Sequence, residues 1–290
     1  MKLSCIAQRE AKLLPILRQE LAMSSTLVKR LKYCHAFLVN GQSARTNFIV
    51  KPGDLVEVLL DEAPPEYPVE DGELSILYED EFLIAIDKPP GLLMHPSPAR
   101  NSGTLANYLQ GYYHRTGQHC LVHPVSRLDR DTFGVVLLAK NAHAHGKMHV
   151  QLLEGGLEKC YHAIVLGCPE GESGIIDAPI ARLSPESLLR CVRMDGKPAR
   201  TAYRLLEQKQ GCSHLELRPL TGRTHQLRVH CAHMGFPIVG DPQYGSDPYG
   251  LPYQQLCAVR LGFTHPITEK FMEISSKQKV SLDFLETHGV

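Results

Sequence analysis

The chain has 290 residues, of which 43% are hydrophobic and 21% charged, with 31 basic and 31 acidic side chains. This composition is that of a folded globular protein with room for a large core and a small extra domain, and its longest apolar runs are far too short to span a bilayer. Nothing in the zero net charge points to nucleic acid, and nine scattered cysteines without a C-x-x-C pair predict free thiols in a reducing cytoplasm.

The first 62 residues predict a small basic domain, with nine Lys and Arg residues against six Asp and Glu. Helices are expected over 11–21 and 25–33, and the hydroxyl side chains at 24–26 suit an N-cap for the second. A hairpin is expected at Asn40-Gly41, the strongest short hairpin signal, before a strand over 55–60. These elements fit a small α/β domain.

The second helix carries Lys29, Arg30 and Lys32 among apolar residues. This pattern is typical of any amphipathic helix with a solvated basic face. Together with the hairpin, it also resembles the S4 RNA-binding fold, in which the basic helix meets a phosphate backbone, although Cys34-His35 stands where that family commonly has a glycine. The resemblance implies that the three basic side chains contact RNA.

Residues 63–87 carry eight acidic and no basic side chains, and they begin with prolines at 64, 65 and 68. Three prolines within five residues cannot continue a helix or a central strand. We therefore predict a linker over 63–73 and a second domain over 74–290.

Short strands predominate in the second domain, and helices are fewer. Strands are expected over 74–78, 82–87, 135–139, 161–166, 202–207, 214–218, 256–264 and 271–275, and helices over 104–114, 142–153 and 224–234. The two kinds of element do not alternate, which argues against a doubly wound parallel fold. We predict an α+β domain built on a mixed, largely antiparallel sheet with flanking helices.

Two familiar chemistries lack their signatures. The chain has neither a G-x-x-x-x-G-K-[ST] loop nor a G-x-G-x-x-G after a strand, so no nucleotide phosphate site is indicated. His145 and His149 lie four apart on an expected helix, but no acidic residue accompanies them and no cysteine pair has zinc spacing. No cofactor and no metal are expected.

Two charged runs carry the candidate chemistry. The first places Asp129 between Arg127 and Arg130, and these guanidiniums favour an ionised carboxylate just before the apolar run 135–139. The second, over 221–230, opens a helix whose N-terminus would favour an anion. Each run alone could be a surface salt-bridge cluster, and spacing does not show whether they meet.

Five ordered motifs resemble the RluA-type RNA pseudouridine synthases. The central one is R-L-D-x-x-T-x-G at 127–134, followed by V-x-L-L-A-K at 135–140. The others are KPPG at 88–91 with His95-Pro96, KCYHA at 159–163, GRTHQLRVH at 222–230, and PIVGD at 237–241 with Tyr244-Gly245. The family usually has His and Ser where this chain has Ser126 and Phe133.

The resemblance implies an enzyme that isomerises specific uridines in ribosomal RNA or tRNA to pseudouridine. Asp129 is then the catalytic carboxylate, attacking C1′ or removing the C2′ proton, and Arg228 pairs with it. Tyr161 is expected to stack on the uracil and is a candidate base for the C5 proton. Arg127 and Arg223 are expected to contact RNA, and the protein is expected to be a monomer without a cofactor or a membrane association.

Two other classes of protein stay open from the residues. One is a ribosome-assembly or RNA-binding factor that has lost the chemistry. The other is a glycosidic-bond hydrolase that uses Asp129 and Asp131 as an acid–base pair.

Overall fold

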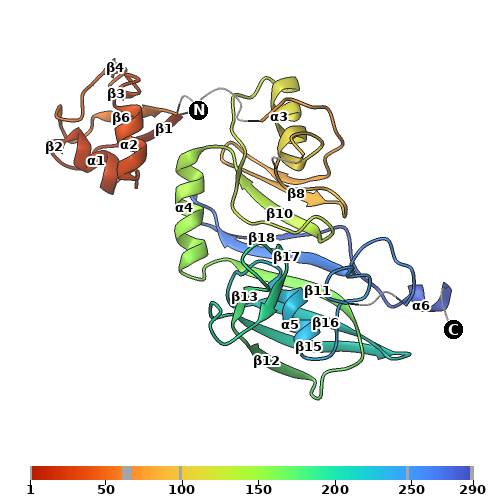
Figure 1. Ribbon diagram of the computed structural model, residues 1–290. Coiled ribbons are helices and arrows are strands. Elements are labelled where there is room, and N and C mark those ends of the chain that lie inside the picture. Colours follow the sequence, from red (N-terminus) through yellow and green to blue (C-terminus); the bar gives the residue numbers. More distant parts are fainter. Residues whose placement is uncertain (1, 61–66, 98–99, 246–247, 288–290) are drawn as a thin grey trace.

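A computed structural model describes residues 2–60, 67–97, 100–245 and 248–287, which form a small N-terminal domain beside a large α+β domain (Figure 1). In the N-terminal domain a four-stranded antiparallel sheet, in the order β1-β6-β3-β4, packs against two helices through one apolar core. Its elements are β1 (Lys2–Ile6), β2 (Ala11–Lys12), α1 (Leu13–Gln19), α2 (Ser25–Leu31), β3 (Phe37–Val39), β4 (Gln42–Ser43), β5 (Ile49–Val50) and β6 (Leu55–Leu59).

Local signals in this domain act as predicted. The Ser24 hydroxyl accepts a hydrogen bond from the backbone N–H of Leu27 at 3.2 Å and so caps α2. Asn40 and Gly41 both have positive φ, at 50° and 78°, which is the conformation of a tight two-residue hairpin. His35 also takes a left-handed φ of 51°, the geometry that glycine favours. Both helices are shorter than predicted, and strand β1 was not predicted.

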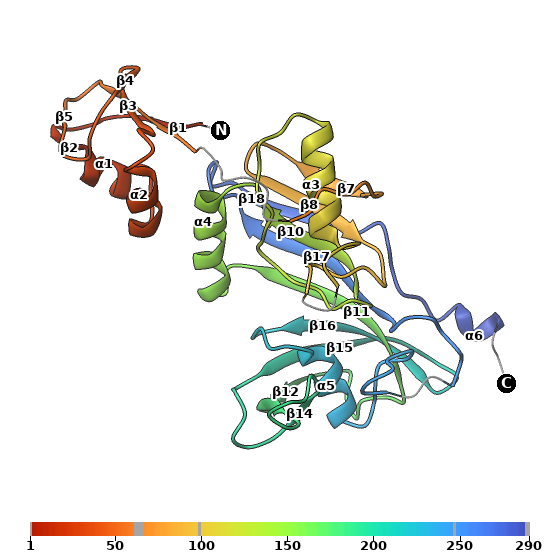
Figure 2. The same ribbon diagram turned by 45° about the horizontal axis from the view of Figure 1, so that its top comes forward.

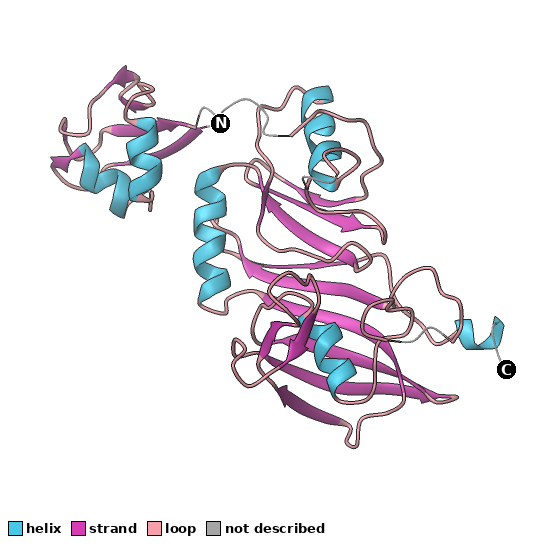
Figure 3. Ribbon diagram, viewed as in Figure 1, coloured by secondary structure: helices cyan, strands magenta, loops and turns pink. Residues whose placement is uncertain are grey.

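In the described part of the large domain, ten strands form one sheet in which only β10 and β17 pair in parallel, so the prediction of a mixed, largely antiparallel sheet is confirmed (Figure 3). The main order is β12-β15-β16-β11-β17-β10-β8-β7, with β18 on β17 and β9 on β10. The strands are β7 (Ile76–Glu79), β8 (Leu83–Lys88), β9 (His123–Pro124), β10 (Phe133–Ala139), β11 (Glu158–Leu166), β12 (Ser173–Asp177), β15 (Arg200–Lys209), β16 (Cys212–Pro219), β17 (Leu256–Thr264) and β18 (Phe271–Ser275).

The helices cover this sheet on both faces because the central strands β8 and β10 are runs of consecutive, mostly apolar residues that are buried at every position. The helices are α3 (Leu105–Arg115), α4 (Ala142–Leu153), α5 (Gln226–His233) and α6 (Phe284–Thr287), and a separate two-stranded ribbon is formed by β13 (Ile180–Arg182) and β14 (Arg190–Val192). On β10, Val136 and Leu138 pack towards α3, whereas Val135 and Leu137 pack towards α4.

One face of the sheet holds both α3 and α5. Helix α3 covers β8 and β10, and α5 covers β11 and β16. Tyr161 of β11 packs against both apolar clusters. Figure 2 shows its strand, β11, between α3 and α5 in that view. The opposite face is covered by α4 at one end and by the segment 280–285 further along.

Gly134 explains the glycine of the central motif. Its φ is 103°, and an added Cβ would lie 2.3 Å from the carbonyl oxygen of Ala258, its partner in the parallel β10–β17 pair. Only glycine therefore allows the two strands to approach at this point. The loop that carries Asp129 enters the sheet here.

The predicted linker is partly outside the described residues, which omit 61–66. Its remainder, 67–73, packs on α3 rather than bridging open space. Glu70 accepts a hydrogen bond from the Gly103 N–H at 2.8 Å, and the Pro68 carbonyl accepts one from Asn107 at 3.0 Å. Residues 67–73 therefore pack on the large domain. The prolines of the linker predicted a break in regular structure, but these two hydrogen bonds fix where the segment lies.

Candidate active site

Asp129 lies in the loop before β10, on the sheet face that holds α3 and α5. Its neighbour Leu128 is buried in the apolar cluster of α3, which anchors the loop. The Asp129 carboxylate accepts a hydrogen bond at 2.9 Å from Nη1 of Arg228, which comes from α5, 99 residues further along the chain. The structure thus brings the two charged runs of the sequence together.

Arg228 is held from three sides. Its Nε and Nη2 donate to the two carboxylate oxygens of Asp241 at 2.7 and 2.8 Å, and Nη2 also donates to Gln243 at 2.8 Å. Its guanidinium carbon lies 4.9 Å from the ring centre of Tyr244. The Arg228 and Asp241 side chains are 6% and 0% exposed, whereas that of Asp129 is 30% exposed. Asp129 is therefore the accessible end of a buried ion-pair chain.

His225 forms a second contact to this cluster. It has a left-handed φ of 57° directly before α5, and its Nδ1 pairs with the Tyr244 hydroxyl at 2.7 Å. Its Nε2 lies 3.9 Å from Asp129. Burial, more than any neighbouring charge, lowers the pKa of His225. A neutral imidazole therefore faces the carboxylate at neutral pH.

Tyr161 contributes the aromatic face of the site. It is half-buried on β11, and burial, followed by the charge of Asp129, raises its pKa above the usual value. The phenol is therefore protonated at neutral pH and can donate a hydrogen bond or stack on a flat ring.

Lys88 holds the loop of Asp129 in place. Its side chain is fully buried, and Nζ donates to the carbonyl oxygens of Pro89, Leu92 and Arg130 at 2.9, 2.9 and 2.8 Å. It thus joins the KPPG motif to the loop of Asp129. Burial lowers the pKa of Lys88 to about 7, although the nearby Asp131 and Asp129 oppose this shift.

Two details of the charged runs differ from the expectations. Arg130 pairs with Asp131, at 2.8 Å, and not with Asp129, because successive side chains of the loop point in different directions. The helix begins at Gln226 and not at 224, because the left-handed His225 interrupts it. Arg228 therefore lies in its first turn.

The other predicted RNA-binding residues lie at the surface. Arg127 is exposed, and Arg223 is exposed with Nε donating to the Pro198 carbonyl at 2.9 Å. Lys29, Arg30 and Lys32 are exposed along α2. None of these five belongs to the hydrogen-bonded cluster of Asp129 within the described residues.

The two departures from the family motif have structural roles. Ser126 is buried, and its hydroxyl accepts a hydrogen bond from the Leu137 N–H at 3.2 Å, which closes the loop onto β10. Phe133 is buried on the opposite sheet face, in a cluster with Val239 and Cys257. Neither side chain reaches Asp129 through a hydrogen bond in the part of the chain described.

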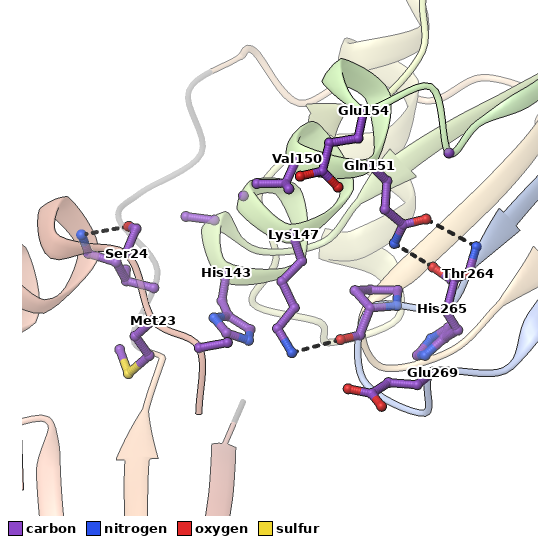
Figure 4. Close-up of a pocket in the computed structure, with 16 residues that line it drawn as sticks. Met23, Ser24, His143, Lys147, Val150, Gln151, Glu154, Thr264, His265 and Glu269 are labelled. Carbon is purple, nitrogen blue, oxygen red and sulfur yellow. Dashed lines mark hydrogen bonds between the residues drawn. The ribbon is translucent and has the colours of Figure 1, made fainter. Parts of the chain in front are cut away.

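A cleft of about 870 Å³ lies elsewhere, between the N-terminal domain and α4 (Figure 4). Met23 and Ser24 line one side, and His143, Lys147 and Gln151 of α4 line the other. It contains none of the predicted catalytic residues. The Asp129 cluster remains the candidate active site, because a buried guanidinium with four hydrogen bonds next to an accessible carboxylate indicates a functional site more strongly than the volume of a cleft does.

Sequence reasoning missed four residues of the cluster, namely Lys88, Asp241, Gln243 and Tyr244. Lys88, Asp241 and Tyr244 lie in motifs that were matched to the family without a role being assigned to them. Asp241, Gln243 and Tyr244 contact Arg228 from positions more than ten residues away in the chain, so the sequence does not show these contacts. His225 was in a recognised run, but its left-handed backbone leaves no sequence signal. None of the described helices is long and apolar enough to cross a membrane.

Comparison with known proteins identifies the class. Residues 82–233 match the RNA pseudouridylate synthase family, and the chain belongs to it. It is 36% identical to the uncharacterized RNA pseudouridine synthase YhcT of Bacillus subtilis over 90% of this chain and 87% of that protein. It is 41% identical to the ribosomal large subunit pseudouridine synthase D of Pseudomonas aeruginosa over 71% of this chain and 65% of that one.

Solved structures agree with the fold. The human RNA pseudouridylate synthase domain containing 1 superposes with a TM-score of 0.57 at 27% identity, over 76% of this chain and 96% of that one. The chain is therefore an RNA pseudouridine synthase, an isomerase that acts on RNA.

Proposed function

We propose that this enzyme isomerises specific uridines of a structured RNA, ribosomal RNA or tRNA, with Asp129 as nucleophile or base and without a cofactor. The observation that supports the proposal most is the 2.9 Å pair between accessible Asp129 and buried Arg228. The reaction moves the uracil bond from N1 to C5 and exchanges no electrons or groups with a second substrate. It therefore requires only acid–base and nucleophilic groups.

Arg228 is proposed to hold the Asp129 carboxylate aimed at the sugar. Its other donors are occupied by Asp241 and Gln243, so its position is set before substrate arrives. Such preorganisation removes the need to reorient the ion pair during the reaction. Attack at C1′ and proton removal at C2′ would both use this carboxylate.

Tyr161 is proposed to stack on the uracil and to hold the detached base. The apolar residues on either side of it would limit escape of the base into water. Its raised pKa weighs against a role as the C5 base in the free enzyme, because a base must be deprotonated. The neutral His225, 3.9 Å from Asp129, is better suited to receive a proton.

RNA is proposed to bind along the exposed basic side chains around the site. Arg127 and Arg223 lie at the surface of the two active-site runs, and the S4-like α2 adds Lys29, Arg30 and Lys32. Phosphate contacts would hold the RNA while the target base turns out of its stack. We propose a monomer in the cytoplasm, where nine free thiols would persist.

The alternatives explain the site less well. A binding protein without chemistry has no use for a buried Arg228 paired on both sides. A hydrolase would need Asp131 as a general acid, but Arg130 engages both of its carboxylate oxygens, at 2.9 and 2.8 Å.

The test is incubation of the full chain with uridine-labelled total RNA, followed by nucleoside analysis of a digest. Pseudouridine identifies the proposed activity, an unchanged digest indicates a binder, and abasic sites indicate a hydrolase. Mapping pseudouridines in cells with and without the gene then identifies the RNA.

A further inference from the structure

Strand β11 presents a second cluster of reactive side chains on the face of the sheet opposite Tyr161. Because side chains alternate along a strand, Cys160 and His162 both point away from the active site, and His162 pairs across the sheet with Glu216 of β16. Cys160 and Glu216 are buried, whereas His162 is half-buried. The proposed reaction uses none of these three groups.

The thiol of Cys160, the imidazole of His162 and the carboxylate of Glu216 lie close enough together to bind one metal ion. One potential ligand atom from each lies within 4.8 Å of the others. In a tetrahedral zinc site the ligand atoms are about 3.3–3.8 Å apart, given metal–ligand bonds of about 2.0–2.3 Å. The three side chains would therefore have to move by about 1 Å to bind one zinc ion.

His214 adds a supporting contact. Its Nε2 lies 3.1 Å from Nδ1 of His162, and this hydrogen bond leaves Nε2 of His162 to bind a metal. A histidine that binds a metal usually uses its other nitrogen in such a hydrogen bond, which fixes the ring orientation. His214 thus acts as the orienting partner.

Two guanidiniums compete for the carboxylate of this cluster. Arg204 and Arg218 lie 3.3 and 3.0 Å from Glu216. Their side chains are 60% and 54% exposed, so they can turn into solvent when a cation arrives.

We propose that Cys160, His162 and Glu216 form a binding site for Zn²⁺ on this outer face. A mixed sulfur, nitrogen and oxygen set suits zinc better than magnesium or calcium, which take oxygen ligands. Bound zinc would join β11 to β16 directly behind Tyr161. The site is separate from the proposed catalysis and stands or falls independently of it.

The Cys160 thiol should release its proton when zinc binds, and this release can be measured. Burial and then Glu216 raise the pKa of Cys160, so the free thiol is protonated at neutral pH. A thiolate ligand must lose that proton, so zinc binding should release about one proton and should tighten as pH rises.

The experiment uses chelator-treated full-length protein titrated first with Co²⁺ and then with Zn²⁺. We expect a near-ultraviolet cobalt–thiolate band that zinc abolishes, and calorimetry in two buffers measures the proton release. Cys160→Ser should abolish the band and weaken zinc binding by roughly 100-fold or more. Cys168→Ser, which removes an exposed thiol outside the cluster, should leave both unchanged.

Two further variants keep the test decisive if Cys160→Ser does not fold. Glu216→Gln should weaken zinc binding by about tenfold or more, and Arg204→Gln should strengthen it because a competing cation is removed. Absence of the cobalt band from the wild-type protein, or an equal band in Cys160→Ser, overturns the proposal.

Discussion

The Asp129 cluster and helix α2 use the same kinds of charged residue in opposite ways. In the cluster, Arg228 is almost completely buried, and its donors meet Asp129, Asp241 and Gln243. On α2, Lys29 and Arg30 are exposed on the surface of a short helix. A buried guanidinium positions one carboxylate, whereas exposed cations attract any phosphate backbone. We therefore expect mutations in the cluster to remove chemistry and mutations on α2 to weaken RNA binding.

The largest expected effect is that of Asp129→Asn, because the amide keeps the shape of the side chain but removes the reactive charge. Pseudouridine formation should fall below detection in single-turnover assays while RNA affinity stays within about threefold of the wild type. Asp131→Asn is the matched control and should retain activity. Turnover by Asp129→Asn within about tenfold of the parent contradicts the assignment of Asp129.

Replacement of Arg228 tests whether burial and pairing matter. Arg228→Ala leaves Asp241 buried without its partner and should lower stability by about 3–5 kcal/mol. Arg228→Lys keeps a charge but loses the paired geometry, so its kcat should fall by about 100-fold in a folded protein.

Arg223→Ala is the exposed counterpart of this change. It should mainly raise KM, with a smaller loss of kcat, since binding common to the ground and transition states is removed. If Arg223→Ala mainly lowers kcat and Arg228→Lys mainly raises KM, the roles of the two arginines are reversed.

The proposed role of the exposed basic residues of α2 is tested by changing Lys29, Arg30 and Lys32 together to Gln. RNA binding should weaken, and the slope of its salt dependence should fall by up to about three units, while single-turnover rates at saturating enzyme stay unchanged. Equal affinity at every salt concentration would show that α2 does not contact RNA, and the S4-like interpretation would then fail.

The smallest expected effect concerns acid stability. Burial lowers the pKa of His143 on α4 from 6.5 to about 4, and Lys147 adds to this shift. The unfolded chain therefore binds a proton between these values that the folded chain refuses, so stability is lost as pH falls from about 6.5 towards 4. His143→Gln should reduce that loss by at most about 3 kcal/mol, measured by urea unfolding at pH 7 and pH 4.5. An unchanged pH dependence would contradict a neutral buried His143.

Local sequence patterns determined most of the secondary structure of this protein. The hairpin at Asn40-Gly41, the capped helix after Ser24 and the apolar run of β10 are short-range features, and each formed near its expected position. The predicted helix boundaries were wrong where the residue type does not reveal the backbone conformation. His225 has a left-handed φ, and α5 therefore begins two residues later than predicted.

The motifs also pointed to Asp129, Tyr161 and Arg228, but only the tertiary structure decided how they meet. Asp129 pairs with a guanidinium 99 residues away and not with its neighbour Arg130, which turns to Asp131. Asp241 and Gln243, from the segment between α5 and β17, complete the cluster. Residue order reports neighbours along the chain, whereas the energy of a buried charge depends on which groups surround it in space. The close pairing of β10 with β17, which Gly134 allows, joins the strand that follows the Asp129 loop to the centre of the sheet.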